Sequence, residues 1–144
     1  MDGEPVDPGQ ELPPVTIEAG VERLAALVLI LTCVSHVAAP SAWQRLFASI
    51  KAQGEAAGLY IAAIHLPLGL MIAAFHWVWT WPGIVVTLVG WALVAKGAAH
   101  LTMPSLARRS LELVEGEQGA SRLRLGGLLM LPVGLAIGWI AMRA

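Results

Sequence analysis

Charged residues are scarce in this chain. Asp, Glu, Lys and Arg make up 13% of its 144 residues, and hydrophobic residues make up 57%. A soluble domain usually has about 25% charged residues, so this chain has too few to cover a water-exposed surface. The mean hydropathy of +0.70 points the same way. The composition therefore argues against a soluble domain and predicts a protein whose solvent is the lipid bilayer.

The chain also lacks the residue patterns of common catalytic and cofactor sites. Cys33 is the only cysteine, which excludes an internal disulfide and a cluster of thiolate ligands. No phosphate-binding glycine loop, nucleophile elbow or HExxH motif occurs. The net charge of −1, with no basic patch among aromatics, argues against nucleic acid. We therefore expect no catalytic residue, no metal site and no nucleic-acid partner.

Four apolar stretches follow an acidic, proline-rich start. Residues 1–20 hold five acidic residues and four prolines but no Lys or Arg, which predicts a flexible tail and no signal peptide. The apolar stretches cover residues 21–39, 56–77, 83–103 and 123–142. Each is close to the roughly 20 residues that cross about 30 Å of hydrocarbon, where the backbone must satisfy its own hydrogen bonds. We expect an all-α membrane domain over residues 21–144 with four transmembrane helices.

The basic residues in the loops and at the ends of these stretches predict the orientation in the membrane. Six of them lie in the first and third loops: Arg45, Lys51, Arg108, Arg109, Arg122 and Arg124. Only Arg23 and Arg143 lie on the other side, so the two loops should be cytoplasmic and both termini outside. Short helices after Pro40 and Pro104 are expected to lie in the cytoplasmic interface. Short helices rich in Ala, Leu and Gly favour a bacterial inner membrane.

Two sequence blocks recur in the same order. Residues 36–45 (HVAAPSAWQR) match 100–109 (HLTMPSLARR), and residues 66–72 (LPLGLMI) match 131–137 (LPVGLAI). This predicts tandem duplication of a two-helix hairpin, with repeats over about residues 21–79 and about 83–144. Both repeats would enter the membrane in the same direction, related by a pseudo-twofold axis along the membrane normal. Pro67 and Pro132 are then equivalent, and each should kink its helix.

The second repeat resembles a family of very short, two-helix bacterial inner-membrane proteins with no assigned function. The resemblance lies in residues 93–104 (LVAKGAAHLTMP), in the basic loop helix that follows, and in residues 124–127 (RLGG). Where this chain has Lys96, that family has an acidic residue. The resemblance implies that the hairpin recurs as a structural unit, and it implies no activity.

Lys96 is the first candidate for a functional residue, because a charge at the bilayer centre costs at least about 2.5–3.5 kcal/mol. Its side chain could extend to lipid phosphate or water, bind an anionic ligand or lipid headgroup, or stay buried as a neutral amine. We expect the four helices to contain no Asp or Glu, which leaves Lys96 without an internal counter-ion. Its repeat equivalent is Thr32, a second polar residue inside the membrane.

The histidines are the other candidates. His65 could bond, as a neutral imidazole, to a carbonyl freed by Pro67 or to a hydroxyl, or it could relay protons or ligate haem. His36 and His100 are repeat equivalents and could form a bis-imidazole site for haem b or a metal. Alternatively, each suits the negative end of its helix dipole. His76 is expected in the membrane interface, beside the tryptophans of the second loop.

Three functions are compatible with this sequence. The first is a non-enzymatic accessory, assembly or scaffold component that packs against a membrane-protein partner or a second copy. The second is a small transporter or channel, which with four helices would work as a dimer. The third is a b-type haem protein that uses His36 and His100. The lack of catalytic groups favours the first.

Overall fold

The computed structural model describes residues 16–143, whose regular structure is entirely helical. Its elements are α1 (Ile17–Ala38), α2 (Pro40–Lys51), the short 3-10 helix η1 (Gly54–Ala56), α3 (Ala57–Phe75), α4 (Ile84–Thr102), α5 (Pro104–Glu112) and α6 (Gly119–Ala141). Of the tail predicted over residues 1–20, residues 1–15 lie outside the described residues. Residues 17–20 differ from the prediction, because they form the first turn of α1.

Three helices, α3, α4 and α6, are long and apolar enough to cross a membrane. The pair α1 and α2 meets the same criterion only as one bent unit, with 102° between the two helices. The first turns of α1 are more polar because they carry Glu18, Glu22 and Arg23. Thr16 caps this helix by accepting a hydrogen bond from the Ala19 N–H at 3.2 Å. The cap explains why α1 begins before the apolar stretch.

The short helices α2 and α5 both begin at a proline. Pro40 and Pro104 occupy the first helical turn, where the missing N–H costs little because it would have no partner inside the helix. Each short helix buries part of one face, through Ile50 in α2 and Leu111 in α5. The two helices expected after these prolines are therefore present, and each starts at the proline itself.

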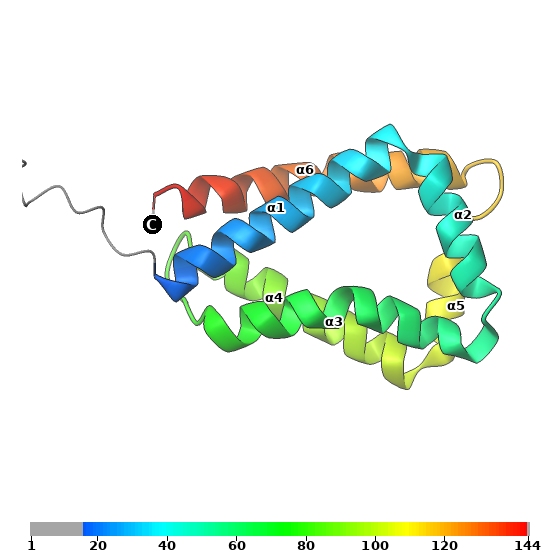
Figure 1. Ribbon diagram of the computed structural model, residues 1–144, viewed down its shortest axis with the longest axis horizontal. Helices are drawn as coiled ribbons and strands as arrows, with labels where there is room; N and C mark the ends of the chain where they lie inside the picture. The colour runs from blue at the N-terminus through cyan, green and yellow to red at the C-terminus, as the bar shows by residue number, and fades with distance from the viewer. Residues whose placement is uncertain (1–15, 144) are drawn as a thin grey trace, which may run out of the picture.

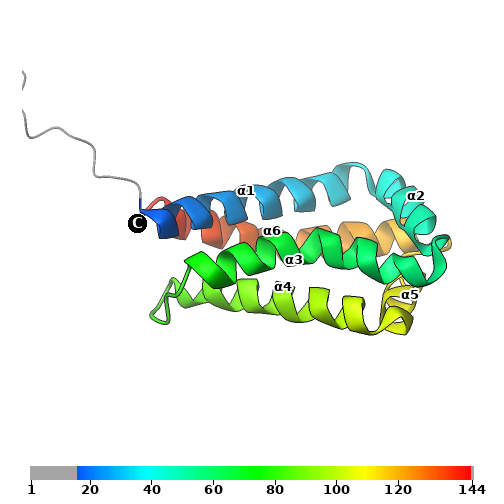
Figure 2. The same ribbon diagram turned by 60° about the horizontal axis from the view of Figure 1, so that its bottom comes forward.

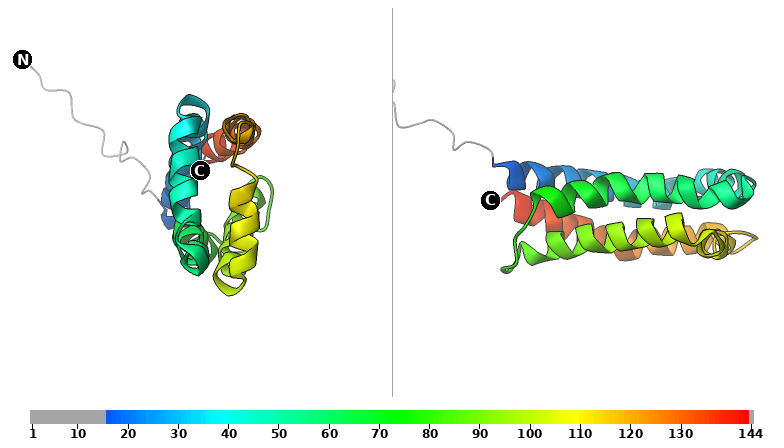
Figure 3. Two further views of the ribbon diagram at one scale, coloured as in Figure 1. Left: turned by 90° about the vertical axis from the view of Figure 1, so that its right-hand side faces the viewer. Right: turned by 90° about the horizontal axis from the view of Figure 1, so that it is seen from below.

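The long helices form two tight pairs that combine the two halves of the chain (Figure 1). α1 packs along α6, and α3 packs along α4. α2 contacts α6, α5 contacts α3, and α2 and α5 lie side by side across one end, as the left view of Figure 3 shows. We call this the bridged end. The predicted hairpin of α1 and α3 is thus open, because each helix packs mainly on a helix from the other half.

The opposite end holds the main core, and we call it the closed end. The beginning of α1 and the end of α6 lie there together (Figure 2). All four long helices contribute to its buried cluster, which consists of Val21, Ala25, Ala26, Ile72, Val86, Ile137 and Ile140. A second cluster at the bridged end consists of Ile50, Ala57, Ile61 and Leu111. The two helix pairs are therefore held together at their ends.

Glycines allow close backbone contact within both pairs. A Cβ added at Gly69 of α3 would lie 2.8 Å from the Val94 nitrogen and 2.9 Å from the Leu93 Cβ of α4. A Cβ at Gly134 of α6 would lie 3.1 Å from Ile30 Cγ1 of α1. Any larger residue at Gly69 would push the backbones apart, while Gly134 has slightly more room.

Candidate functional site

A carboxylate, an imidazole and a hydroxyl are buried together at the closed end. Glu22 lies on α1, His76 directly follows α3, and Thr87 lies in the first turn of α4. Their exposed fractions are 4%, 0% and 0%. His76 Nε2 lies 2.8 Å from Glu22 Oε1, and His76 Nδ1 lies 3.0 Å from Thr87 Oγ1. This cluster connects the two helix pairs through polar contacts.

The hydrogen bonds determine where the protons of the cluster lie. Thr87 Oγ1 donates to the Val78 carbonyl at 2.7 Å, so it accepts from His76 Nδ1, which must carry a proton. His76 Nε2 and Glu22 Oε1 then share one further proton. With that proton on nitrogen the two groups form an ion pair, and with it on oxygen both are neutral. The pair adds no net charge to the core in either case, which makes its burial tolerable.

Glu22 Oε2 is buried and has no hydrogen-bond partner among the described residues. The cluster can therefore accept one more proton or donor at this oxygen. One expectation is wrong here, because a carboxylate, Glu22, lies inside α1 and is buried. His76, expected beside the tryptophans, is fully buried in the structure. Sequence reasoning missed Glu22 because an acid near a helix start, next to Arg23, is usually exposed and interacts with the helix dipole.

His65 and His100 face each other between α3 and α4. Their ring centroids are 6.4 Å apart and the ring planes differ by 13°. Each Nδ1 donates to the carbonyl one turn earlier, at 2.8 Å to Ile61 for His65 and 2.7 Å to Lys96 for His100. His100 Nε2 accepts from the Ser110 hydroxyl at 3.2 Å. These bonds hold both rings in place with Nδ1 protonated.

Pro67 and Pro132 lie inside α3 and α6, and neither ends its helix. A proline offers no N–H to the carbonyl four residues earlier, so Ala63 and Leu128 lose their usual helical donor. His65 bonds neither the freed carbonyl of Ala63 nor a hydroxyl, because its Nδ1 donates to the Ile61 carbonyl instead. The ring is therefore oriented by an ordinary helical turn.

His36 lies against the aromatic side chains of α2. Its ring stacks on Trp43 with centroids 4.3 Å apart, and its Nδ1 donates to the Thr32 carbonyl at 2.8 Å. Thr32 thus contacts His36 through its backbone carbonyl. Within the described residues, no ring contact joins His36 to His100, which lies against His65. The structure therefore separates the two histidines that the sequence suggested as a shared ligand pair.

Lys96 is exposed on α4 and forms no salt bridge with any described residue. Glu22, the buried carboxylate, lies toward the closed end of α1, whereas Lys96 lies in the half of α4 nearer the bridged end. The structure therefore leaves the charge of Lys96 to lipid, water or a ligand.

A salt bridge joins the two halves at the bridged end. Lys51 Nζ of α2 lies 2.6 Å from Glu115 Oε2 and 3.7 Å from Glu112 Oε1. The hydrogen bond to Glu115 and the negative charges of both carboxylates raise the pKa of Lys51 above its usual 10.5. Gln44 adds a hydrogen bond from Nε2 to the Gly116 carbonyl at 2.7 Å. These contacts tie α2 to the turn after α5.

Comparison with protein families, curated proteins and solved structures finds no match for this chain. The resemblance of residues 93–104 to short two-helix proteins stays an expectation. Within the described part of the chain, no three His, Cys, Asp or Glu side chains are grouped so that they could hold a metal ion. Function must therefore be argued from the geometry.

Proposed function

We propose that this chain is a non-enzymatic integral membrane protein, an accessory or assembly subunit that packs its helices against a protein partner. One observation supports this most directly: only 28% of the residues in each candidate span are buried within the chain. The buried polar groups, by contrast, are engaged in contacts that hold the fold together. What the molecule offers to its surroundings is apolar helix surface.

A site-specific photo-crosslinker tests this proposal. Leu70 of α3 and Leu135 of α6 are equally exposed, at 53% and 54%, and occupy equivalent positions in the two proposed repeats. A photoreactive residue at each site, activated in native membranes, should give a discrete protein adduct at one or both. The mass of the adduct distinguishes a foreign partner from a second copy. Lipid adducts alone at both sites would contradict the proposal.

The membrane arrangement we propose has four spans, with α1 as the fourth. α1 packs along α6, and α6 meets the membrane criterion by itself. The carboxylate of α1, Glu22, does not prevent a span because it shares a proton with His76. The basic loop residues favour a cytoplasmic bridged end and external termini, in a bacterial inner membrane. In a Cys33→Ala background, a cysteine at Gly3 should react with an impermeant reagent in intact cells, and one at Ser49 should not. The reverse pattern would invert the orientation.

We further propose that the two halves arose by tandem duplication, with α1, α2 and α3 corresponding to α4, α5 and α6. The packing supports this, because α1 on α6 becomes α4 on α3 when the halves are exchanged. Contacts of α2 with α6 likewise become contacts of α5 with α3. Ile72 and Ile137, which match at an offset of 65, are both fully buried.

The salt bridge at the bridged end fits the same relation. Lys51 and Glu115 match at the offset of 64 that relates His36 to His100, and they contact each other. Equivalent residues meet in this way only near a twofold axis. Identical charges would repel there, so divergence to opposite charges is stabilising.

A circular permutant tests the duplication. The beginning of α1 and the end of α6 lie close together (Figure 2). Residue 143 can therefore be joined to residue 16 by a linker as long as the 76–83 connection. New termini opened between Trp79 and Thr80 would produce the order α4, α5, α6, α1, α2, α3. We expect this chain to insert and melt near the parent temperature, whereas a permutant opened inside α5 should not. Failure of both would contradict the proposal.

A small transporter or channel that works as a dimer is the second candidate. Its support is the buried Glu22–His76 pair, which shares a proton and keeps one acceptor free. Proton flux into liposomes that is lost in Glu22→Gln would favour this candidate, and absence of flux would remove it. The haem hypothesis has no comparable support, because His36 stacks on Trp43 and His100 lies against His65.

A further inference from the structure

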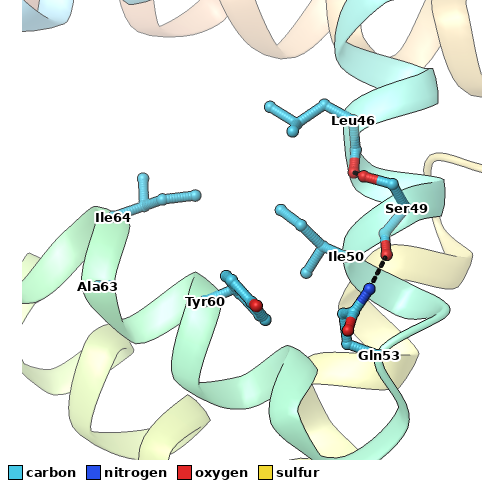
Figure 4. Close-up of a pocket in the computed structure, with 7 residues that line it drawn as sticks. All are labelled: Leu46, Ser49, Ile50, Gln53, Tyr60, Ala63 and Ile64. Carbon is cyan, nitrogen blue, oxygen red and sulfur yellow. Dashed lines mark hydrogen bonds between the residues drawn. The ribbon is translucent and has the colours of Figure 1, made fainter.

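A cavity of about 460 Å³ lies between α2 and α3 on the inner side of the bridged end. Figure 4 shows Leu46 and Ile50 of α2 and Tyr60 and Ile64 of α3 pointing toward the same space. Ala63 has the smallest side chain of the residues that line the cavity. The volume is within the range of about 300–1,000 Å³ that is usual for small-molecule sites.

The lining of this cavity is mostly apolar, with two polar side chains from α2 and the residues just after it. Ser49 of α2 and Gln53, two residues beyond its end, also line it, and both donate to backbone carbonyls of α2, Ser49 to Leu46 and Gln53 to Ser49. The Tyr60 hydroxyl has no hydrogen-bond partner among the described residues. The cavity therefore has a mostly apolar lining with a few polar groups, which suits an amphiphilic ligand.

A positive charge lies one helical turn from the lining residue Ser49. Arg45 lies one turn before Ser49 on α2, so the two side chains are neighbours on the helix surface. Arg45 is exposed and forms no salt bridge with a described residue, whereas Lys51, near the end of the same helix, is paired with Glu115. A guanidinium without a carboxylate partner suits a phosphate.

We propose that this cavity binds a membrane phospholipid with an anionic headgroup, with an acyl chain between α2 and α3 and the phosphate at Arg45. α2 turns by 102° from α1, which suits a helix lying at headgroup level with its apolar face toward hydrocarbon. An acyl chain is the solvent at this depth and fills an apolar gap that the protein leaves open. The lipid site requires membrane insertion but no protein partner.

The other half of the chain provides a matched comparison. The equivalent of Ala63 is Leu128, whose larger side chain is also exposed. The equivalent of Leu46 is Ser110, which is engaged by His100. The small residue that opens the cavity thus occurs in the first half alone, and this predicts a single lipid site off the proposed axis.

The test uses the full chain in nanodiscs that contain equal amounts of phosphatidylglycerol and phosphatidylcholine. A phosphatidylglycerol with a photoreactive acyl chain should label peptides from α2 and α3. Ala63→Phe should abolish this labelling while Leu128→Phe leaves it unchanged. Arg45→Gln should lower retention of phosphatidylglycerol over phosphatidylcholine about fivefold in native mass spectrometry, the effect of one basic residue near an anionic surface. Arg109→Gln, at the equivalent position, is the control.

Melting of each variant shows that it is folded, and Ala63 is exposed, so the larger side chain projects away from the packed helices. Labelling elsewhere, or labelling that survives Ala63→Phe, would overturn the proposal. The proposal would also be overturned if residues 46–64 were shielded from the lipid probe in a dimer or partner complex. A protein helix would then occupy the cavity. Loss of the protein adducts at Leu70 and Leu135 would instead contradict the partner proposal and leave the lipid site standing.

Discussion

The two halves that the proposed duplication relates have similar packing residues at some matched positions and different polar residues at others. The residues that pack the helices correspond: Gly69 with Gly134, and Ile72 with Ile137. The buried position held by Glu22 in α1 is held by Val86 in α4. Under the proposed duplication, small and apolar residues maintain the arrangement of helices in both halves, while the buried polar contacts differ between them.

The histidines of the two halves illustrate the same division. His36 and His100 each donate Nδ1 to a carbonyl one turn earlier, so the local geometry is shared. The contacts beyond that turn differ, since His36 stacks on Trp43 and His100 bonds Ser110. The two histidines thus share the same local hydrogen bond and differ in their other neighbours.

The largest effect is expected where the halves differ most, at the closed end. His76→Ala removes the partner of a buried carboxylate, and loss of one member of such a pair costs about 3–5 kcal/mol. Glu22→Gln should cost less, about 1–2 kcal/mol, because the amide can still donate to His76 Nε2. Thermal unfolding in mild detergent measures both. Equal melting temperatures for His76→Ala and the parent would show that the cluster does not join the helix pairs.

Alanine at the matched glycines should give the next largest difference. Gly69→Ala places a Cβ 2.8 Å from a backbone nitrogen, and overpacking of this kind costs about 1–3 kcal/mol, partly offset by a helix propensity gain of up to about 1 kcal/mol. Gly134→Ala has contacts of 3.1–3.3 Å, so we expect it to be nearly neutral. The ranking is read from melting temperatures, and a reversed order would mean that the α1–α6 pair is the tighter one.

A smaller effect is expected at the bridged end, where Lys51 and Glu115 differ in charge. The pKa of Lys51 is raised by its bond to Glu115, so the ion pair contributes stability below the usual lysine pKa of 10.5 and loses it as pH rises through the higher folded value. Lys51→Met should therefore melt slightly below the parent at pH 8, and the difference should shrink as pH rises through the raised pKa of Lys51. The double exchange Lys51→Glu with Glu115→Lys should recover the parent melting temperature.

The smallest effect on stability is expected at Lys96, whose equivalent is Thr32. Lys96→Met removes a charge that has no carboxylate partner among the described residues, so the melting temperature should stay equal or rise. If the ammonium binds an anionic headgroup, retention of anionic lipid falls in Lys96→Met and is partly kept in Lys96→Arg. Unchanged lipid retention in the Met variant would leave Lys96 as a side chain that only extends to the interface.

Much of the helix content was predictable because it depends on local patterns. The apolar stretches, Pro40 and Pro104 define helices whose observed ends lie near the predicted ones. The helix pairing was not predictable in the same way, since an apolar face packs equally well on either neighbour until loop and side-chain geometry decide. α1 and α2 meet at an angle of 102°. α2 therefore runs across the bridged end and separates α1 from α3, and α1 packs along α6 instead.

By itself, the sequence determined the all-helical character and the positions of apolar stretches near membrane length, because hydropathy and backbone hydrogen bonding act over single segments. Only the tertiary structure decided that Glu22, His76 and Thr87 meet, and that His100 lies against His65 rather than His36. Contacts between residues 54 positions apart, such as Glu22 and His76, depend on how separate helices pack. No local periodicity specifies that packing.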